Sequence, residues 1–329
     1  MSRRILAVLV AAGACAAVIL VVASANGDGE GPPAAGSATD RWTALRPALL
    51  ERTEVGAARI GRFVYVVGGF ERSSGGTTAA VERYDIAQDA WTRVRDMPVG
   101  LNHTVAVAYR GDLYVMGGYG SPTGLEDEVA TLYRYNPERD RWSRLRSAPS
   151  TRAAHAMGVI GHRLYVAGGA RDGQPLRTLE IYNFRRRRWS RGPSMRFARE
   201  HLAGTVADGF FYVLAGRAAG VGNFAFAERY NPRRRRWQRL PDMEKERGGI
   251  AAAAVGHRVV VFGGEESAGT IREVEVYDPG TRRWSRLPDL ATPRHGLGGV
   301  SRGRRVYAIE GGPTPGFDFS SAIEVLDLP

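Results

Sequence analysis

Hydrophobic residues beyond position 40 alternate with polar residues in short runs bounded by glycine, as in RFVYVVGG ending at Gly69 and RLYVAGG ending at Gly169. β-Branched and aromatic residues dominate these runs, which is typical of half-buried β-strands. No stretch after residue 40 keeps the helical period of 3.6 residues. The pattern therefore predicts an all-β fold.

The strand pattern is itself repeated. The chain has six tryptophans, 47 to 51 residues apart, at Trp42, Trp91, Trp142, Trp189, Trp237 and Trp284. Each repeat also has a glycine doublet, at residues 68–69, 117–118, 168–169, 263–264 and 311–312, with Ala215-Gly216 in the fourth. A period near 50 residues indicates an array of one structural unit. We expect four strands in each unit: a, b ending in the doublet, c carrying a tyrosine, and d carrying the tryptophan.

A glycine doublet followed by a spaced tyrosine and tryptophan resembles the kelch repeat. The resemblance covers residues 41–329 and implies a six-bladed kelch-type β-propeller, each blade a four-stranded antiparallel sheet around a central channel. The last repeat ends at IEVLD, before any tryptophan, whereas Trp42 precedes the first full repeat. We therefore expect the N-terminal strand to complete the last blade and close the ring.

The N-terminus begins MSRR, continues with an apolar run from Ile5 to Ala25, and then becomes rich in Gly, Pro, Ala and Ser. We expect residues 1–25 to be a signal peptide cleaved after Ala25 or an uncleaved transmembrane helix, and residues 26–40 to be a flexible linker before the propeller at 41–329. Both alternatives place the propeller outside the cytoplasm, either secreted or anchored to the membrane.

Composition limits the chemistry. Cys15 is the only cysteine, so residues 41–329 hold no disulfide and no thiolate ligand. Kelch-like galactose-oxidase-type enzymes need a Tyr–Cys crosslink, which this sequence cannot form. We expect no cofactor.

Recurring residues are expected to be structural, because recurrence is what a repeated scaffold requires. This applies to the six tryptophans, which we expect between blades, and to a glutamate that stands two residues before the tyrosine position. That glutamate recurs at Glu82, Glu180, Glu228, Glu275 and Glu324, and Tyr133 replaces it in the second repeat. We expect it to be a hydrogen-bonding position of the family.

Candidate ligand-binding residues lie before strand a, after the doublets and, for Glu310, directly before the last doublet. They are His103, Arg152, His155, Arg199, His201, Arg217, Arg247, Glu265, Arg294, His295 and Glu310, and we expect them around the channel mouth. The alternative is that these side chains only hydrogen-bond the connecting loops. No metal site is expected, because residues of different blades should lie too far apart for ligands about 2 Å from one ion.

The net charge is +12, and 46 residues are Lys or Arg, of which only Lys245 is a lysine. Arginine runs such as 185–188 and 233–236 fall in the predicted c–d turns, on the same face as the a–b turns. This face could attract anionic lipids or wall polymers, or its arginines could simply be solvated. A nucleic-acid partner is not expected.

We interpret the chain as a non-enzymatic, monomeric, extracytoplasmic binding module whose d–a and b–c loops meet a protein or glycan partner. The alternative rests on resemblance to bacterial kelch propellers that are sugar mutarotases similar to sialate epimerase. In that case the four candidate arginines before strand a would hold a carboxylate at the channel mouth, with Glu265 and Glu310 as acid–base groups.

Overall fold

The computed structural model describes residues 41–328, and the calls on residues 1–25 and 26–40 lie outside that range. The described residues form strands and turns only, so the predicted all-β class is confirmed. Within this range, no helix is long and apolar enough to cross a membrane.

Six antiparallel sheets have four strands each, numbered here in chain order. Sheet 1 contains β3 (Gly56–Ile60), β4 (Phe63–Val67), β7 (Val81–Asp85) and β8 (Ala90–Arg93). Sheet 2 contains β9 (Val105–Tyr109), β10 (Asp112–Met116), β11 (Leu132–Asn136) and β12 (Arg141–Arg144). Sheet 3 contains β13 (Ala156–Ile160), β14 (Arg163–Ala167), β17 (Leu179–Asn183) and β18 (Arg188–Gly192).

Sheet 4 contains β19 (Ala203–Ala207), β20 (Phe210–Leu214), β23 (Ala227–Asn231) and β24 (Arg236–Arg239). Sheet 5 contains β25 (Ala251–Val255), β26 (Arg258–Phe262), β29 (Val274–Asp278) and β30 (Arg283–Leu287). Sheet 6 contains β31 (Gly298–Arg302), β32 (Arg305–Ile309), β33 (Ile323–Asp327) and β1 (Thr43–Ala44).

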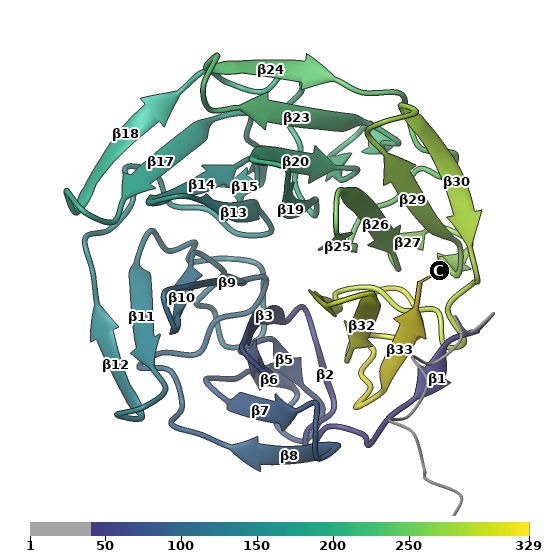
Figure 1. The fold of residues 1–329 in the computed structure, drawn as a ribbon. Helices are drawn as coiled ribbons and strands as arrows, with labels where there is room; N and C mark the ends of the chain where they lie inside the picture. The colour runs from purple at the N-terminus through teal and green to yellow at the C-terminus, as the bar shows by residue number, and fades with distance from the viewer. Residues whose placement is uncertain (1–40, 329) are drawn as a thin grey trace, which may run out of the picture. The chain divides into compact units, whose positions relative to one another are not determined.

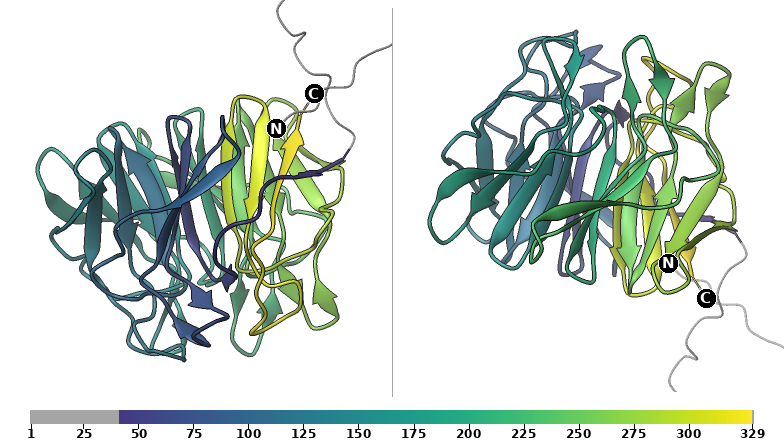
Figure 2. Two further views of the ribbon diagram at one scale, coloured as in Figure 1. Left: turned by 90° about the horizontal axis from the view of Figure 1, so that it is seen from below. Right: turned by 90° about the horizontal axis from the view of Figure 1, so that it is seen from above.

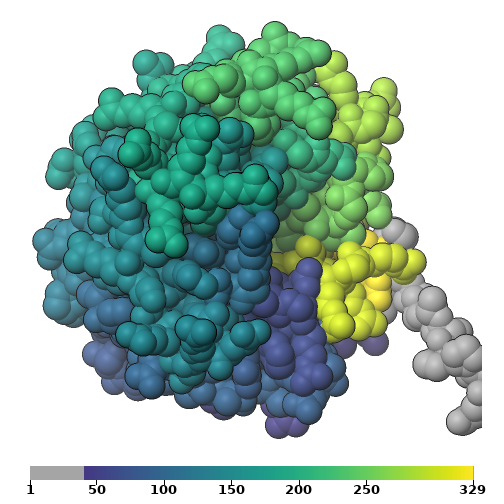
Figure 3. Space-filling view, turned by 60° about the vertical axis from the view of Figure 1, so that its left-hand side comes forward, coloured from purple at the N-terminus to yellow at the C-terminus, as the bar shows by residue number. Residues whose placement is uncertain are grey.

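The sheets follow one another around a common centre, with strand a of each sheet innermost and strand d outermost (Figure 1). β1 is the outer strand of sheet 6, where Thr43 pairs with Val325 and Ala44 with Glu324. Figure 3 shows the yellow C-terminal segments beside the purple segments that follow residue 41. The N-terminal strand thus occupies the position that the sequence predicts for it.

The tryptophans tie each sheet to its neighbour. The Trp91 indole N–H donates to the Arg46 carbonyl, 2.8 Å away, and Trp142 donates in the same way to Arg95. Trp42 donates to the Pro288 carbonyl at 2.9 Å, so the same contact spans the junction of the two chain ends. The remaining tryptophans, Trp189, Trp237 and Trp284, bond the carbonyls of Arg146, Pro193 and Pro241.

Each doublet is a pair of residues with positive φ directly after strand b, as at Gly68 (64°) and Gly69 (92°). In sheet 6 the pair is Glu310 (54°) and Gly311 (99°), so the predicted doublet 311–312 is wrong by one position. The second position is glycine in all six sheets because a Cβ there would meet the backbone of the preceding d–a connection. At Gly311 that Cβ would lie 2.6 Å from the His295 carbonyl oxygen.

The connections lie at the two ends of the ring (Figure 2). The a–b and c–d turns share one end, as the hydrogen bond from the Ile86 amide to the Arg62 carbonyl shows, and we call this end the basic face. The d–a and b–c connections form the loop face. They contain the short strands β2 (Arg52–Thr53), β5 (Phe70–Glu71), β6 (Gly76–Thr77), β15 (Ala170–Arg171), β16 (Gln174–Pro175), β21 (Arg217–Ala218), β22 (Gly222–Asn223), β27 (Glu265–Glu266) and β28 (Gly269–Thr270).

Candidate functional site at the mouth of the central channel

One residue from each d–a connection encircles the loop-face end of the channel. These six mouth residues have positive φ, between 50° and 69°, and are Glu54, His103, Ala154, His201, Gly249 and Gly296. The first five are linked in series by backbone hydrogen bonds of 2.9 to 3.0 Å, beginning with the His103 amide donating to the Glu54 carbonyl. The amide of Gly296 continues the series, and its carbonyl accepts from Val55 at 3.2 Å. The mouth is therefore a closed, rigid ring of backbone.

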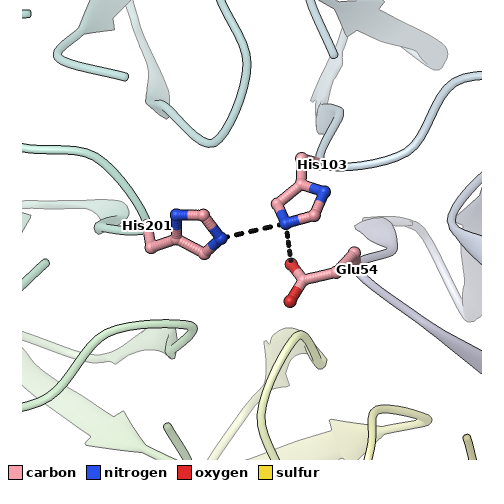
Figure 4. A group of neighbouring side chains, drawn as sticks. All are labelled: Glu54, His103 and His201. Atoms are coloured by element: carbon pink, nitrogen blue, oxygen red, sulfur yellow. Dashed lines mark hydrogen bonds and ion pairs between the residues drawn. The ribbon is translucent and has the colours of Figure 1, made fainter. Parts of the chain in front are cut away.

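Three of the mouth residues point their side chains at one another across the opening (Figure 4). The His103 Nε2 lies 2.9 Å from the His201 Nε2 and 3.2 Å from the Glu54 Oε2. One ligand-type atom from each of these three residues lies within 4.8 Å of the others. The expectation that residues from different sheets stand too far apart to share an ion is therefore wrong at this position, because the ring here is narrow.

A second layer fixes both imidazoles. The His103 Nδ1 donates to the Asn102 Oδ1 at 2.6 Å, and the Asn102 amide nitrogen in turn donates to the Thr77 hydroxyl and the Gly124 carbonyl. The His201 Nδ1 donates to the Glu200 carboxylate. In a neutral imidazole only one nitrogen carries a proton, so both Nε2 atoms are left as lone-pair acceptors.

Three further predicted residues surround this group. The Arg217 guanidinium donates to the His201 Nε2 at 3.0 Å, to Glu200 at 3.1 Å and to Glu265 at 2.7 Å. The His295 ring lies 3.5 Å from the Glu54 carboxylate and 3.6 Å from Glu265. The structure therefore brings His103, His201, Arg217, Glu265 and His295 together, although they come from four different sheets or their connections.

Burial sets the protonation of the group. It raises the pKa of Glu54 to about 8, an effect that the Glu265 charge adds to and the Arg217 charge opposes. Burial, followed by the positive charge of Arg217, lowers the pKa values of His103 and His201 well below their ordinary range. Both imidazoles are thus neutral at physiological pH, and they are available as ligands or proton acceptors.

The channel below the mouth is a cavity of about 460 Å³ lined by the six innermost strands. A second cavity of about 70 Å³ lies directly under the three converging side chains, and Val55, His155 and Leu202 line both. His155 is one position deeper than the mouth residues, and within the described residues neither of its ring nitrogens has a hydrogen-bond partner. Burial lowers its pKa well below the ordinary value. His155 is therefore a neutral imidazole that lines both cavities while its ring lies against Gly117.

The predicted arginines are not at the mouth, and this part of the sequence interpretation needs correction. Arg152, Arg199, Arg247 and Arg294 are fully buried inside their sheets. Each forms an ion pair with the recurring glutamate of its own sheet, at 2.8 Å for Arg199–Glu228 and at 3.3 Å for Arg294–Glu324. A ligand at the channel mouth cannot reach these guanidinium groups, so they cannot hold the carboxylate of a sugar acid there.

Glu310 is likewise buried, and it accepts a hydrogen bond from Arg52 at 2.9 Å. Arg52 also pairs with Glu82 at 2.8 Å, so one guanidinium serves two buried carboxylates. Burial, together with the Glu82 charge, raises the pKa of Glu310 to about 7 even though Arg52 lowers it. Glu310 therefore belongs to the scaffold rather than to the mouth.

Sequence reasoning missed Glu54, Asn102 and Glu200. A signal for Glu54 exists in the sequence, since aligning the repeats on strand a places it in the column of His103 and His201. No such signal exists for Asn102 and Glu200, because their role depends on which imidazole nitrogen they contact.

The architecture defines a class, a repeat protein in which antiparallel sheets surround a channel. The family model for the KLHDC2/KLHL20/DRC7 Kelch-repeats domain matches residues 54–246, and that for the Kelch motif matches residues 246–291. The chain therefore belongs to the kelch-repeat family, as its glycine, tyrosine and tryptophan spacing predicts. Kelch-repeat proteins generally mediate protein–protein interactions.

Individual relatives are similar over part of the chain. Kelch-like protein terF of Aspergillus terreus (strain NIH 2624 / FGSC A1156) is 28% identical over 255 residues, which cover 68% of this chain and 53% of that protein. Kelch repeat and BTB domain-containing protein 1 of Camelpox virus (strain CMS) is 26% identical over 47% of this chain and 28% of its own length. The chain thus spans about half or less of these relatives.

Among solved structures, that of YjhT superposes with a TM-score of 0.73 at 17% identity, covering 85% of this chain and 95% of that one. This similarity supports the propeller-like fold.

Proposed function

We propose that the protein is a non-enzymatic binding module and that its loop face docks a protein partner. The observation that carries the proposal is the distribution of exposed apolar side chains. Among the described residues, all large hydrophobic side chains that are exposed lie in d–a or b–c connections, and none lies on the basic face: Leu49, Val99, Leu125, Val221 and Phe317. Exposed apolar groups on one face are typical of protein interaction sites and favour a protein over a glycan.

The loop face is also held in shape before any partner binds. Neighbouring b–c connections are hydrogen-bonded to each other, as where the Thr77 amide donates to the Pro122 carbonyl at 2.6 Å and the Thr270 hydroxyl to the Pro313 carbonyl at 2.8 Å. Phe317 packs on Phe70 with ring centroids 4.8 Å apart, and Phe70 packs on His103. Such preorganisation lowers the entropic cost of binding.

Site-specific photocrosslinking in the native cells tests this proposal. A photoreactive phenylalanine analogue replaces Phe317 or Leu125 on the loop face, or Arg234 on the basic face as the matched exposed control. We expect one discrete crosslinked protein from the loop-face positions and none from Arg234. Crosslinks from Arg234 alone, or none from the loop face while the chain is folded and abundant, would contradict it.

We also propose that the six four-stranded sheets are the blades of a closed six-bladed propeller and that it acts outside the cytoplasm. The closure is supported by the pairing of β1 with β33, and the location by the basic start and the apolar run from Ile5 to Ala25. Protease added to intact cells or spheroplasts should degrade the propeller without lysis. Protection until lysis would refute the location and leave the docking proposal untouched.

A further inference from the structure

We propose that Glu54, His103 and His201 form a binding site for one divalent transition-metal ion, such as Zn²⁺, at the mouth of the channel. This inference goes beyond the docking function and does not depend on it. Two imidazoles and one carboxylate are a donor set that Zn²⁺ uses with an open fourth position.

The convergence of three donor groups leads to this proposal. Asn102 and Glu200 hold the Nδ1 atoms of His103 and His201, which turns both Nε2 atoms toward the same point, 2.9 Å apart. The Glu54 Oε2 lies 3.2 Å from the His103 Nε2 and is the third donor atom there. Three donor atoms from three different d–a connections thus converge at one buried point, where all of them can bind a single cation.

The dimensions also fit. Ligands about 2.0 to 2.1 Å from a tetrahedral ion are separated by roughly 3.3 Å. The Nε2–Nε2 separation of 2.9 Å and the His103 Nε2–Glu54 separation of 3.2 Å approach that value, and all three donor atoms lie within 4.8 Å of one another, so side-chain adjustments complete the site. The cavity of about 70 Å³ beneath the three residues offers space for a fourth ligand, and the channel offers a path from solvent.

The second layer has the form that metal sites require. Metal-binding histidines usually donate their other N–H to a carboxylate or a carbonyl oxygen, which orients the ring. Glu200 accepts this bond from His201 and the Asn102 Oδ1 accepts it from His103, while the His295 Nδ1 faces the second oxygen of Glu54 at 3.5 Å. Arg217, which now donates to the His201 Nε2, keeps its two bonds to Glu200 and Glu265 when a metal takes that lone pair.

The backbone ring aims the three side chains. Four of the six mouth residues are non-glycine residues with left-handed φ values, namely Glu54 (56°), His103 (50°), Ala154 (50°) and His201 (52°), while Gly249 and Gly296 occupy the same position in sheets 5 and 6. Because Ala154 shares this conformation without offering a ligand atom, the ring itself sets the conformation, and it brings the donor atoms of Glu54, His103 and His201 within 4.8 Å of one another.

A titration of the chelator-stripped full-length protein with Zn²⁺, followed by calorimetry and by the visible spectrum of the Co²⁺ form, tests the proposal. We expect one ion per chain and the absorption bands of a four-coordinate Co²⁺ site. His103→Gly and His201→Gly should each weaken binding by at least about 100-fold, and Asn102→Ala by about 10- to 100-fold. The glycine variants adopt the residue that sheets 5 and 6 already use, so they should fold.

The matched control is His257→Gln, an exposed histidine on the basic face, which should bind like the parent. If a glycine variant nevertheless unfolds, Glu54→Gln keeps the shape and should still reduce affinity by at least about 10-fold. The proposal is overturned if the parent binds no Zn²⁺ in a defined ratio, if the variants at residues 54, 103 and 201 bind as the parent does, or if only His257→Gln loses binding. None of these results bears on the photocrosslinking outcome.

Discussion

At the residue scale, an ion pair between a buried arginine and a buried glutamate recurs from sheet to sheet and compensates both charges. Five sheets hold such a pair, and in sheet 2 both partners are absent, with Leu101 and Tyr133 in the two positions. The joint loss of both partners was readable from the sequence, but only after aligning the repeats on strand a. Without this alignment, nothing in the sequence shows that Arg152, Arg199, Arg247 and Arg294 each have a glutamate partner, and they are then interpreted as residues of an exposed pocket.

Removing one partner of such a pair should be costly. Arg199→Leu leaves Glu228 buried and uncompensated, which should lower the free energy of unfolding by about 3–5 kcal/mol. Arg286→Ala, which breaks an exposed pair with Asp289, is the control and should cost less than about 1 kcal/mol. Denaturant unfolding measures both. Equal losses in the two variants would mean that the buried pair does not hold the sheet.

Glu310 should make stability depend on pH. Its pKa is about 7 in the folded chain against an ordinary value of 4.5, so the folded state binds the proton more tightly than the unfolded state. The Glu310 contribution to stability is therefore fully present below pH about 4.5 and is lost, by about 3 kcal/mol in total, as the pH rises through 7. Glu310→Gln should flatten this part of the profile, and the exposed Glu51→Gln should not. An unchanged profile in Glu310→Gln would contradict the shift.

At the scale of the element, the position after strand b is restricted to glycine by its neighbour. A Cβ on Gly69 would lie 2.5 Å from the Thr53 carbonyl oxygen, at a φ of 92°. Gly69→Ala should therefore cost more than about 3 kcal/mol, from left-handed strain and the clash together. Gly161→Ala, at a φ of 59° with nothing within 4 Å of its Cβ, isolates the strain and should cost about 1–2 kcal/mol in thermal or denaturant unfolding. If Gly69→Ala and Gly161→Ala lower the free energy of unfolding equally, the close approach to the Thr53 carbonyl is not what restricts this position to glycine.

The closing strand is the second prediction at this scale. β1 pairs with β33, the Leu45 amide donates to the Ile323 carbonyl at 3.0 Å, and Trp42 packs against Phe262. Deleting residues 41–46 exposes the edge of sheet 6 and should abolish the single cooperative unfolding transition in calorimetry. A deletion of six residues within 26–40 is the control. A truncated chain that melts like the parent would show that the ring does not need this strand.

The sequence predicted the elements well because each strand is a local pattern. It misplaced the last doublet because Gly311-Gly312 satisfies the motif letter by letter, whereas the backbone puts Glu310 in the first position. A spacing rule cannot distinguish these, since the register of strand b is set by pairing with strand a, where Gly298 faces Ile309.

At the scale of the whole molecule, the two faces differ in charge and in apolar exposure. The arginine runs 185–188 and 233–236 are exposed on the basic face, away from the exposed apolar groups of the loop face. If this face attracts anionic lipid, Arg233→Ser with Arg234→Ser should weaken co-sedimentation with anionic vesicles by about 30-fold, from about 1 kcal/mol for each of the two arginines. Added salt should weaken the binding of the parent.

The matched control removes two exposed arginines from the loop face, Arg72→Ser with Arg171→Ser, and should leave vesicle binding unchanged. Binding that does not respond to salt, or that drops equally in both double variants, would contradict a specific role for the basic face.

Ring geometry explains why the mouth could not be predicted in full. The sequence identifies irregular His, Arg and Glu positions, but the angle between sheets decides which of them meet. His103 and His201 come from sheets separated by one other, yet they touch because Ala154 between them carries no long side chain. His155, next in sequence, faces the channel instead.

The most direct measurement is anomalous X-ray diffraction at the zinc edge from crystals of the Zn²⁺-loaded protein. We expect one peak, about 2.0–2.2 Å from the Nε2 atoms of His103 and His201 and from an oxygen of Glu54. A map with no peak at the channel mouth, in which the two Nε2 atoms still lie in direct contact as in Figure 4, would contradict the metal site.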